Sequence, residues 1–470
     1  MNPISQIKYV PLEASPVKSF FVSMLTRDIR LEDAILDLLD NSVDGAIRNS
    51  NREIDKPYAN KHAEIDFCGN SFTISDNCGG IPWSLHNYAF RLGKASDSPQ
   101  DVPGTVGTYG IGMKRAMFKM GGHCLISTRS GSDEYSIEIS PEWLANEKDW
   151  KLPVQPVKRS RDEDGTTIFV TDLYPGIAKR FDEDSKAFTS ELIKLVSTHY
   201  AFIIDKGFEV SINGIHVKPR PTKLIFDTGT DIKNSVKPYI YKTKTSDGVE
   251  VFLAVGFTRP IPSQNEILNG QEANRYSSMD AGWTVLCNDR AVLYADRSEL
   301  TGWGEANVPR YHTQFIAISG IVEFRSDDPS KLPTTTTKRG VDASSPLFLQ
   351  VKNKMREGMR LFTDYTNKWK GREDESKEQI LKGVPLSFAQ VKIQSESIRM
   401  NPTLRTFTRG EQFVPNLPLP KILEPAKRRI SFIRESKDIS NLAEYFGNSD
   451  MEPYEVGGQC FDLLLKEARR

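Results

Sequence analysis

The stretch LEDAILDLLDNSVDGA, residues 31–46, decides how this chain folds. Its apolar residues recur at helical spacing and predict a helix over residues 28–50. At about 100° per residue, Asp37, Asn41 and Asp44 fall within about 60° of one another on this helix. The apolar side chains occupy the opposite side: Ile35, Leu38, Leu39, Val43 and Ala46. We expect the apolar side to pack on a sheet and the polar side to face outward, either as a solvated face or as a ligand site.

A second polar segment, SDNCGGIP at residues 75–82, follows a strand-like pattern. An aspartate at a strand end followed by paired glycines favours a tight turn that exposes the carboxylate of Asp76. A carboxylate there can accept a hydrogen bond from an exocyclic amine, although a plain Asp-Asn-Gly turn is the alternative. We expect Cys78 in this turn to be a buried small side chain rather than a reactive thiol.

A third segment, GTYGIGMKRA at residues 107–116, combines a glycine-rich loop with the start of an apolar helical pattern. Gly107, Gly110 and Gly112 permit close backbone approach. A loop that opens a helix presents free N–H groups and a positive dipole end, which suits phosphate. The segment matches neither the dinucleotide fingerprint nor the P-loop. The polar segment 91–112 is expected to be a mobile loop.

The composition excludes several protein classes. The 470 residues carry 62 basic and 62 acidic side chains, so net charge gives no global attraction to nucleic acid. No run of 18 apolar residues exists, and we expect no membrane association. The first residues lack the pattern of a secretory signal. Five scattered cysteines without a CxxC motif argue against a disulfide scaffold or a zinc site, and the expected location is the cytoplasm.

The pattern along the chain predicts an α+β protein with four parts: residues 1–178, 179–344, 345–383 and 384–470. Strand-like runs in the first part are 63–67, 71–75, 125–129, 135–139 and 166–172. The second part contains a helical run at 190–200 and strand-like runs at 208–212, 215–218, 249–257, 283–288 and 316–324. The pattern of residues 345–382 predicts one long helix or two. Residues 386–437 hold ten basic and four acidic residues, which suits either a nucleic-acid backbone or a solvated linker.

In their order and spacing, the three polar segments resemble the motifs of the Bergerat-fold (GHKL) ATPases, which include gyrase B, Hsp90, MutL, MORC proteins and histidine kinases. GTTIFVTD at 165–172 resembles the motif that closes the nucleotide site. Residues 191–219 resemble the start of a MutL or MORC transducer domain, and LPTTTTKRG at 332–340 resembles its lysine-bearing loop. The resemblance implies an α/β sandwich with helices on one face of a mixed, mostly antiparallel sheet. A ribosomal S5-like transducer domain and a helical C-terminal extension would follow.

The resemblance also implies roles for individual residues. At the nucleoside, Asp76 would bind the adenine amine, Gly80 would let the chain pass the base, and Thr166 or Thr167 would support Asp76. At the phosphates, Asp37 would be the general base, Asn41 would ligate Mg²⁺, and Asp44 would lie near the sugar–phosphate side. The lid residues would be Gly107, Gly110, Ile111 and Gly112, with Lys114 close to phosphate oxygens. Lys338 would reach the γ-phosphate from the second domain.

The implied function is a Mg²⁺-dependent, ATP-hydrolysing conformational clamp that acts on DNA or on a partner protein. Relatives pair their ATPase domains when ATP binds, so we expect an ATP-dependent homodimer with residues 1–30 as the exchanged arm. The base of the family is usually Glu, and Asp37 is one methylene shorter, which leaves a non-hydrolysing nucleotide-dependent scaffold as an alternative. A histidine kinase is disfavoured because no phosphoacceptor helix is evident.

Overall fold

The computed structural model describes residues 17–50, 56–91, 93, 110–155, 157, 162–229, 235–263, 266–267, 281–335, 338–403, 410–420 and 429–469. Gly107, the first 16 residues and most of the segment 91–112 lie outside this description. The chain divides into two compact units, Met1–Pro420 and Lys421–Arg470.

The first sheet of the larger unit has eight strands among the described residues. Their spatial order is β5 (Val154–Gln155), β4 (Asp133–Ile139), β3 (Gly121–Ser130), β6 (Gly165–Leu173), β2 (Ser71–Asp76), β1 (His62–Cys68), β7 (Glu209–Ile212) and β8 (Ile215–His216). Neighbours pair antiparallel except β1 and β7, which are parallel. The mixed, mostly antiparallel sheet that we expected is confirmed.

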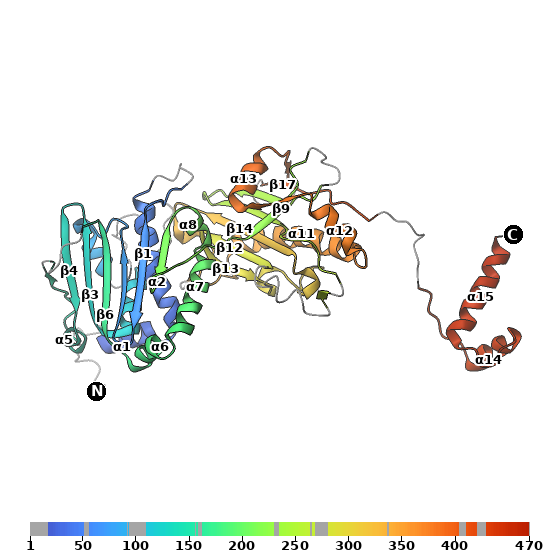
Figure 1. Cartoon of the computed structure of the whole chain (residues 1–470), viewed down its shortest axis with the longest axis horizontal. Helices are drawn as coiled ribbons and strands as arrows, with labels where there is room; N and C mark the ends of the chain where they lie inside the picture. The colour runs from blue at the N-terminus through green and yellow to red at the C-terminus, as the bar shows by residue number, and fades with distance from the viewer. Residues whose placement is uncertain are drawn as a thin grey trace, which may run out of the picture. The chain divides into compact units, whose positions relative to one another are not determined.

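Helices cover the buried face of this sheet (Figure 1). They are α1 (Lys18–Arg27), α2 (Leu31–Arg48), α4 (Gly112–Met120), α6 (Pro175–Asp182), α7 (Ser185–His199) and α8 (Ala201–Asp205), with the short α3 (His86–Phe90) and α5 (Pro141–Ala145) at the periphery. Alternate residues of β1 are buried, whereas Glu64 and Asp66 between them are exposed on the other face.

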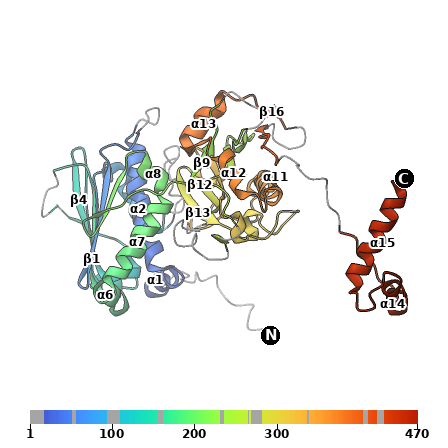
Figure 2. The same cartoon turned by 45° about the vertical axis from the view of Figure 1, so that its right-hand side comes forward.

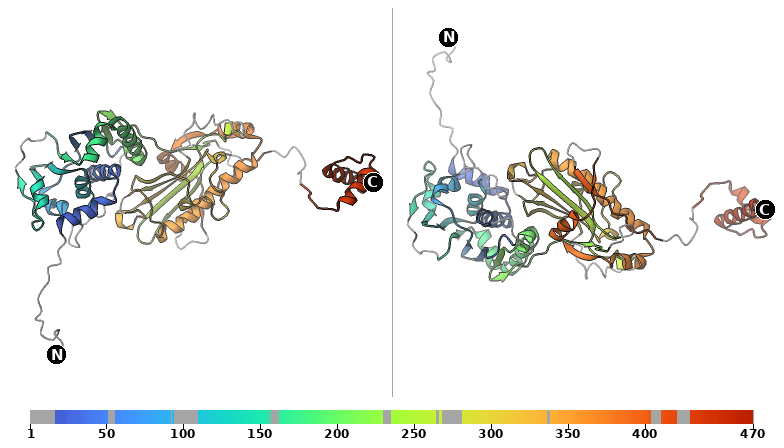
Figure 3. Two further views of the ribbon diagram at one scale, coloured as in Figure 1. Left: turned by 90° about the horizontal axis from the view of Figure 1, so that it is seen from below. Right: turned by 90° about the horizontal axis from the view of Figure 1, so that it is seen from above.

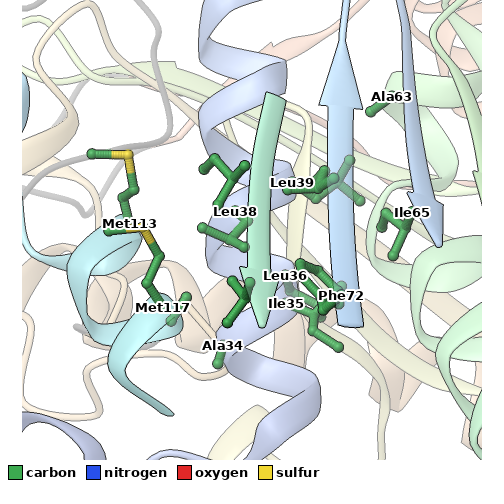
Figure 4. Close-up of a cluster of buried hydrophobic side chains, with 14 of the residues drawn as sticks. Ala34, Ile35, Leu36, Leu38, Leu39, Ala63, Ile65, Phe72, Met113 and Met117 are labelled. Atoms are coloured by element: carbon green, nitrogen blue, oxygen red, sulfur yellow. The ribbon is translucent and has the colours of Figure 1, made fainter. Parts of the chain in front are cut away.

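Helix α2, predicted over 28–50, is the central element of this layer. Figure 4 shows it between the methionines of α4 on one side and apolar side chains of β1 and β2 on the other. Ile35, Leu39, Val43 and Ala46 have no exposed surface. The apolar stripe therefore packs as its spacing predicts.

The first layer extends beyond residue 178, where we placed a boundary. Strand β7 continues the sheet beside β1, and β8 forms a hairpin with β7. Asn213 in the connecting turn adopts a left-handed φ of 47° and accepts a hydrogen bond from the N–H of Phe67. The hairpin signal was correct, but its strands belong to the first sheet.

A second sheet of seven described strands follows. Its order is β13 (Arg290–Asp296), β12 (Gly282–Cys287), β14 (Ile318–Arg325), β11 (Glu250–Phe257), β10 (Tyr239–Lys244), β17 (Gly410–Phe413) and β16 (Asn401–Pro402). Figure 3 shows the long helix α11 (Pro346–Lys368) along its strands, and Met355, Met359 and Phe362 of this helix are fully buried. A separate helix, α12 (Glu373–Ile380), follows α11, so residues 345–382 form two helices.

Residues 384–403 and 410–420, for which a solvated linker was one expectation, are folded onto this layer. Strand β15 (Val384–Ser387) pairs with β9 (Lys223–Phe226), and β17 pairs with β10. Helix α13 (Phe388–Glu396) buries Phe388 and Val391 in a cluster with the second sheet. The prolines that interrupt helices here permit short strands at a sheet edge.

The two sheets meet through the helices α7 and α8, which contact β13 (Figures 1 and 2). Ala201 and Phe202 of α8 belong to a buried cluster with Leu286 and Ala291 of the second sheet. The ring of Phe202 also meets that of Phe388 at a centroid distance of 5.9 Å. Apolar packing therefore joins the two layers within one compact unit.

The smaller unit contains two helices, α14 (Ser436–Tyr445) and α15 (Pro453–Ala468). Only Ala443 and Val456 are buried among its described residues. None of the helices described for the chain combines the length and the apolar character that a membrane crossing needs.

Candidate functional site

The polar side of α2 is largely buried, contrary to the solvated face that an isolated amphipathic helix would show. Asp37, Asp40 and Asp44 are at most 6% exposed, whereas Asn41 is exposed. Helix α4 contacts α2, and side chains from the second layer reach the same face. Buried carboxylates need compensating charges or hydrogen bonds, which makes this face the candidate site.

Asp37 lies against the start of α4. Its Oδ2 accepts a hydrogen bond from the guanidinium of Arg115 at 2.5 Å, and both side chains are buried. A Cβ on Gly112 would lie 3.4 Å from the Cβ and Cγ atoms of Asp37, so α4 begins in contact with this carboxylate. Burial raises the pKa of Asp37, and the charges of Lys338 and Arg115 oppose this rise without cancelling it.

Asp76 ends β2 as predicted and forms the other end of the site. Its Oδ2 accepts from the hydroxyl of Ser42 at 2.8 Å, and its Oδ1 accepts from the N–H groups of Cys78 and Thr166 at 2.9 and 3.2 Å. Of the two threonines that we considered, Thr166 contacts Asp76. The hydroxyl of Thr167 lies instead 2.9 Å from that of Ser75, because consecutive residues of β6 point to opposite faces.

Two glycines allow backbone segments to approach closely around Asp76. A Cβ on Gly45 of α2 would lie 2.7 Å from the carbonyl oxygen of Cys78. Gly80 has a left-handed φ of 64°, and a Cβ there would lie 1.9 Å from the carbonyl oxygen of Arg129. The turn is therefore held between α2 and β3, and neither position accepts a larger residue without displacement.

The segment that the resemblance assigns to a lid, residues 107–112, is described only from Gly110 onward. Gly110 has a φ of 68°, Ile111 precedes α4, and Gly112 is its first residue. The ammonium of Lys114 donates to the carbonyl oxygens of Ala89 and Gly110 at 2.8 and 2.5 Å, and burial lowers its pKa to about 8. In this arrangement Lys114 ties the base of the lid to α3.

Lys338 reaches the site from the second layer. It lies in a tight loop in which its N–H donates to the carbonyl of Thr335, and it has a left-handed φ of 54°. Its ammonium donates to Oδ2 of Asp40 at 3.0 Å. Burial alone would lower the pKa of Lys338, but Asp40, Asp44 and Asp37 outweigh this effect and raise it.

The structure thus brings Asp37, Asn41, Asp44, Gly112 and Lys338 to one face of α2, with Asp76, Gly80 and Thr166 further along. Sequence reasoning assigned no role to four polar partners of these residues: Asp40, Ser42, Arg115 and Arg290. Asp40 could have been found, since it lies only about 60° from Asp37 on a helical wheel. The others are identified by contacts between distant segments and leave no local signal.

A cavity of about 740 Å³ lies elsewhere, between α8, the second sheet and α13. Several cations that line it are already paired: Lys206 and Arg325 bind Asp289, and Lys392 binds Glu323. Phe202, Phe252 and Phe388 supply its apolar lining. We place the functional site on α2 because the sequence motifs converge there.

Comparison with protein-family models agrees with this placement. Residues 29–166 match the family described as histidine kinase-, DNA gyrase B- and HSP90-like ATPases. The match contains α2, the Asp76 turn and the start of α4. A comparison with curated proteins gave no match.

The burial of Cys78 yields a prediction about thiol chemistry. Burial raises the pKa of Cys78, whereas a hydrogen bond from Ser71 lowers the pKa of the exposed Cys68. We expect iodoacetamide to label Cys68 in the native protein while Cys78 stays unmodified until the protein is denatured. Peptide mass mapping over time measures both rates. Equal labelling of the two thiols in the native protein would contradict the buried turn.

Proposed function

We propose that this chain, whose residues 29–166 belong to the histidine kinase-, DNA gyrase B- and HSP90-like ATPase superfamily, binds ATP with Mg²⁺ and uses it to control a conformational clamp. The observation that carries the proposal is the convergence of Asp76 and Lys338, from two distant segments, on the helix α2 that carries Asp37. Asp76 would hold the base, Asp37 would lie at the reacting end, and Lys338 would contact the terminal phosphoryl group.

At the base, Asp76 would accept a hydrogen bond from the adenine amine. Ser42, the N–H of Cys78 and the N–H of Thr166 fix the orientation of the carboxylate. A carboxylate held by three donors is a preorganised acceptor and discriminates against a carbonyl at the same position of the base.

At the phosphates, Asp37 would orient the attacking water and take its proton. Arg115 occupies one carboxylate oxygen and leaves the other for water. Lys338 would stabilise the charge that develops on the terminal phosphoryl group. Lys114 and the lid residues 107–112 would close over the phosphates.

The site fits Mg²⁺ held mainly by the nucleotide. Among the described residues, no three His, Cys, Asp or Glu side chains gather as a metal site. Mg²⁺ commonly takes one or two protein ligands and completes its shell with phosphate oxygens and water. The exposed amide oxygen of Asn41 is such a ligand, and the ion would neutralise phosphate charge.

The proposed clamp would work through the two layers of the larger unit. The second layer, which would act as the transducer, supplies Lys338, so binding of the triphosphate would link both layers. The client would be DNA or a partner protein, and we expect a cytoplasmic location. A non-hydrolysing switch is the second candidate, because the ion pair with Arg115 restrains the short carboxylate of Asp37.

The first prediction from this proposal concerns base recognition. We expect Asp76→Asn to weaken ATP binding by about tenfold or more, because the amide presents a donor or a weaker acceptor to the adenine amine. Calorimetry with ATP, GTP and Mg²⁺ measures the affinities. Asp66→Asn, on the exposed face of β1, is the matched control. Equal affinity of the Asp76 variant and the wild type would exclude this adenine site.

The second prediction concerns pH. The base acts only when ionised, so phosphate release should fall as the pH falls through the pKa of Asp37. Burial raises this pKa, and the fall should therefore occur at a higher pH than for an ordinary aspartate. Arg115→Met removes a charge that lowers the pKa of Asp37, so the fall in phosphate release should move to still higher pH. Arg115→Lys should move it less.

Phosphate release by Asp37→Asn provides the control for this profile. This variant should bind ATP and release no phosphate. A wild type that binds ATP but also releases none would favour the non-hydrolysing switch.

The third prediction concerns dimerisation. Phe20 and Met24 of α1 are 65% and 52% exposed, and they lie within the proposed arm, residues 1–30. We expect a non-hydrolysable ATP analogue to convert the monomer into a dimer that buries this apolar surface, and Phe20→Glu to prevent the conversion. Sedimentation velocity measures the conversion of monomer to dimer. Ile215→Glu, at a 51% exposed position of β8, should still dimerise. A wild type that binds the analogue and stays monomeric would contradict the clamp.

A further inference from the structure

Asp40 is the residue of α2 on which both layers converge. Its Oδ1 accepts from the guanidinium Nε of Arg290 at 3.0 Å and from the hydroxyl of Tyr200 at 2.7 Å. Its Oδ2 accepts from the ammonium of Lys338 at 3.0 Å. Oδ1 therefore contacts Arg290 of β13 and Tyr200 at the C-terminal end of α7, whereas Oδ2 contacts the lysine loop.

The environment of Asp40 fixes its charge. Asp40 and Arg290 are each 1% exposed, and Lys338 is 8% exposed. Burial alone would raise the pKa of Asp40, but Lys338 and Arg290 outweigh it and hold the pKa at about 2. The carboxylate is ionised at neutral pH, and each cation depends on it for compensation.

Arg290 is itself held rigidly. It stacks over the ring of Tyr200 at 4.1 Å and donates to the carbonyl oxygens of His199 and Ala291. The hydroxyl of Tyr200 also lies 2.9 Å from the carbonyl oxygen of Leu36, one turn before Asp40, so its single proton is shared between the two acceptors. The carboxylate is thus fixed relative to α2, α7 and β13 together.

The lysine keeps binding capacity beyond this contact. An ammonium has three N–H donors, and the bond to Asp40 uses one of them. Asp40 directly precedes Asn41 and lies about 60° from Asp37 on the helix. The ammonium is therefore held at the end of the site that the proposed function assigns to the terminal phosphoryl group.

We propose that Asp40 is the positioning residue that holds Lys338 for recognition of the terminal phosphoryl group and connects that recognition to the second sheet through Arg290. The inference rests on the proposed ATP site. Asp40 itself does not touch the nucleotide. Without it, Lys338 would lose its orientation, and the site would lose its preference for a triphosphate over a diphosphate.

Nucleotide preference provides the test, because ADP lacks the group that Lys338 recognises. Calorimetry with Mg²⁺ compares a non-hydrolysable ATP analogue and ADP as ligands of the full-length protein. We expect Asp40→Asn and Lys338→Met each to reduce the preference for the analogue by about tenfold while the affinity for ADP is unchanged. The double variant should lose no more than either single variant, because both changes remove one interaction.

Asp33→Asn is the matched control. Asp33 lies on the same helix and pairs with Arg339, the neighbour of Lys338, at 2.6 Å. Asp33 therefore holds the same loop without contacting the ammonium of Lys338. We expect Asp33→Asn to keep the preference for the ATP analogue over ADP. An equal loss in the Asp33 and Asp40 variants would show that Asp40 only anchors the loop and would overturn the proposal.

A gentler variant covers the case in which Asp40→Asn does not fold. Tyr200→Phe preserves all charges and removes one hydrogen bond to Asp40, so it should reduce the preference by about threefold. The positioning role would be overturned if the effects of Asp40→Asn and Lys338→Met were additive. It would also be overturned if the affinity for ADP fell in parallel with the affinity for the ATP analogue. A wild type that binds neither ligand would instead overturn the proposed function, so the two failures are distinguishable.

Discussion

The carboxylate of Asp40 between Lys338 and Arg290 is the interaction on which the arrangement of the larger unit depends. A buried carboxylate is strongly destabilising unless cations compensate it, and removal of one partner leaves an unpaired charge. Both cations come from the second layer, whereas Asp40 belongs to the first. The first layer therefore cannot bury the polar face of α2 satisfactorily by itself. The apolar packing of α8 on the second sheet holds the two layers together, and the ion pairs of Asp40 fix how the layers are aligned.

Helix α2 also sets the distances within the site. At 100° and about 1.5 Å per residue, its polar face runs from Asp40 through Asp37 and Asn41 to Gly45 and Ser42. One edge of this face meets the lysine loop, and the other meets the turn that contains Asp76. The two ends of the site are thus on one rigid element, and Gly45 lets the turn approach without a side chain between them.

Local sequence patterns were sufficient for the elements that carry the candidate site. The three polar segments predicted α2, the Asp76 turn and the start of α4, because each depends on local rules for helices, turns and glycine. The burial of Asp37 and Asp44 was not predictable, since it depends on α4 and on a loop about 300 residues away. Arg115 and Arg290 had no local signal, because a cation on a helix or strand acquires its role only from the carboxylate that the fold brings to it. Likewise, the folding of β15 onto β9 and of β17 onto β10 depends on pairing between distant segments.

The charge balance of the site bears on how a triphosphate could bind. Three carboxylates of α2, Asp37, Asp40 and Asp44, lie within electrostatic reach of Lys338, and Arg115 and Arg290 bind two of them. Three acids and three bases thus already compensate one another before the several negative charges of a triphosphate are added. The ammonium of Lys338 has donors left, but its positive charge is largely offset by three acidic neighbours. Under the proposed function, additional positive charge must therefore accompany the nucleotide, and Mg²⁺ on the exposed side of Asn41 would supply it. Lys338 would then provide geometric selectivity for the terminal phosphoryl group, and the metal ion would provide most of the charge neutralisation.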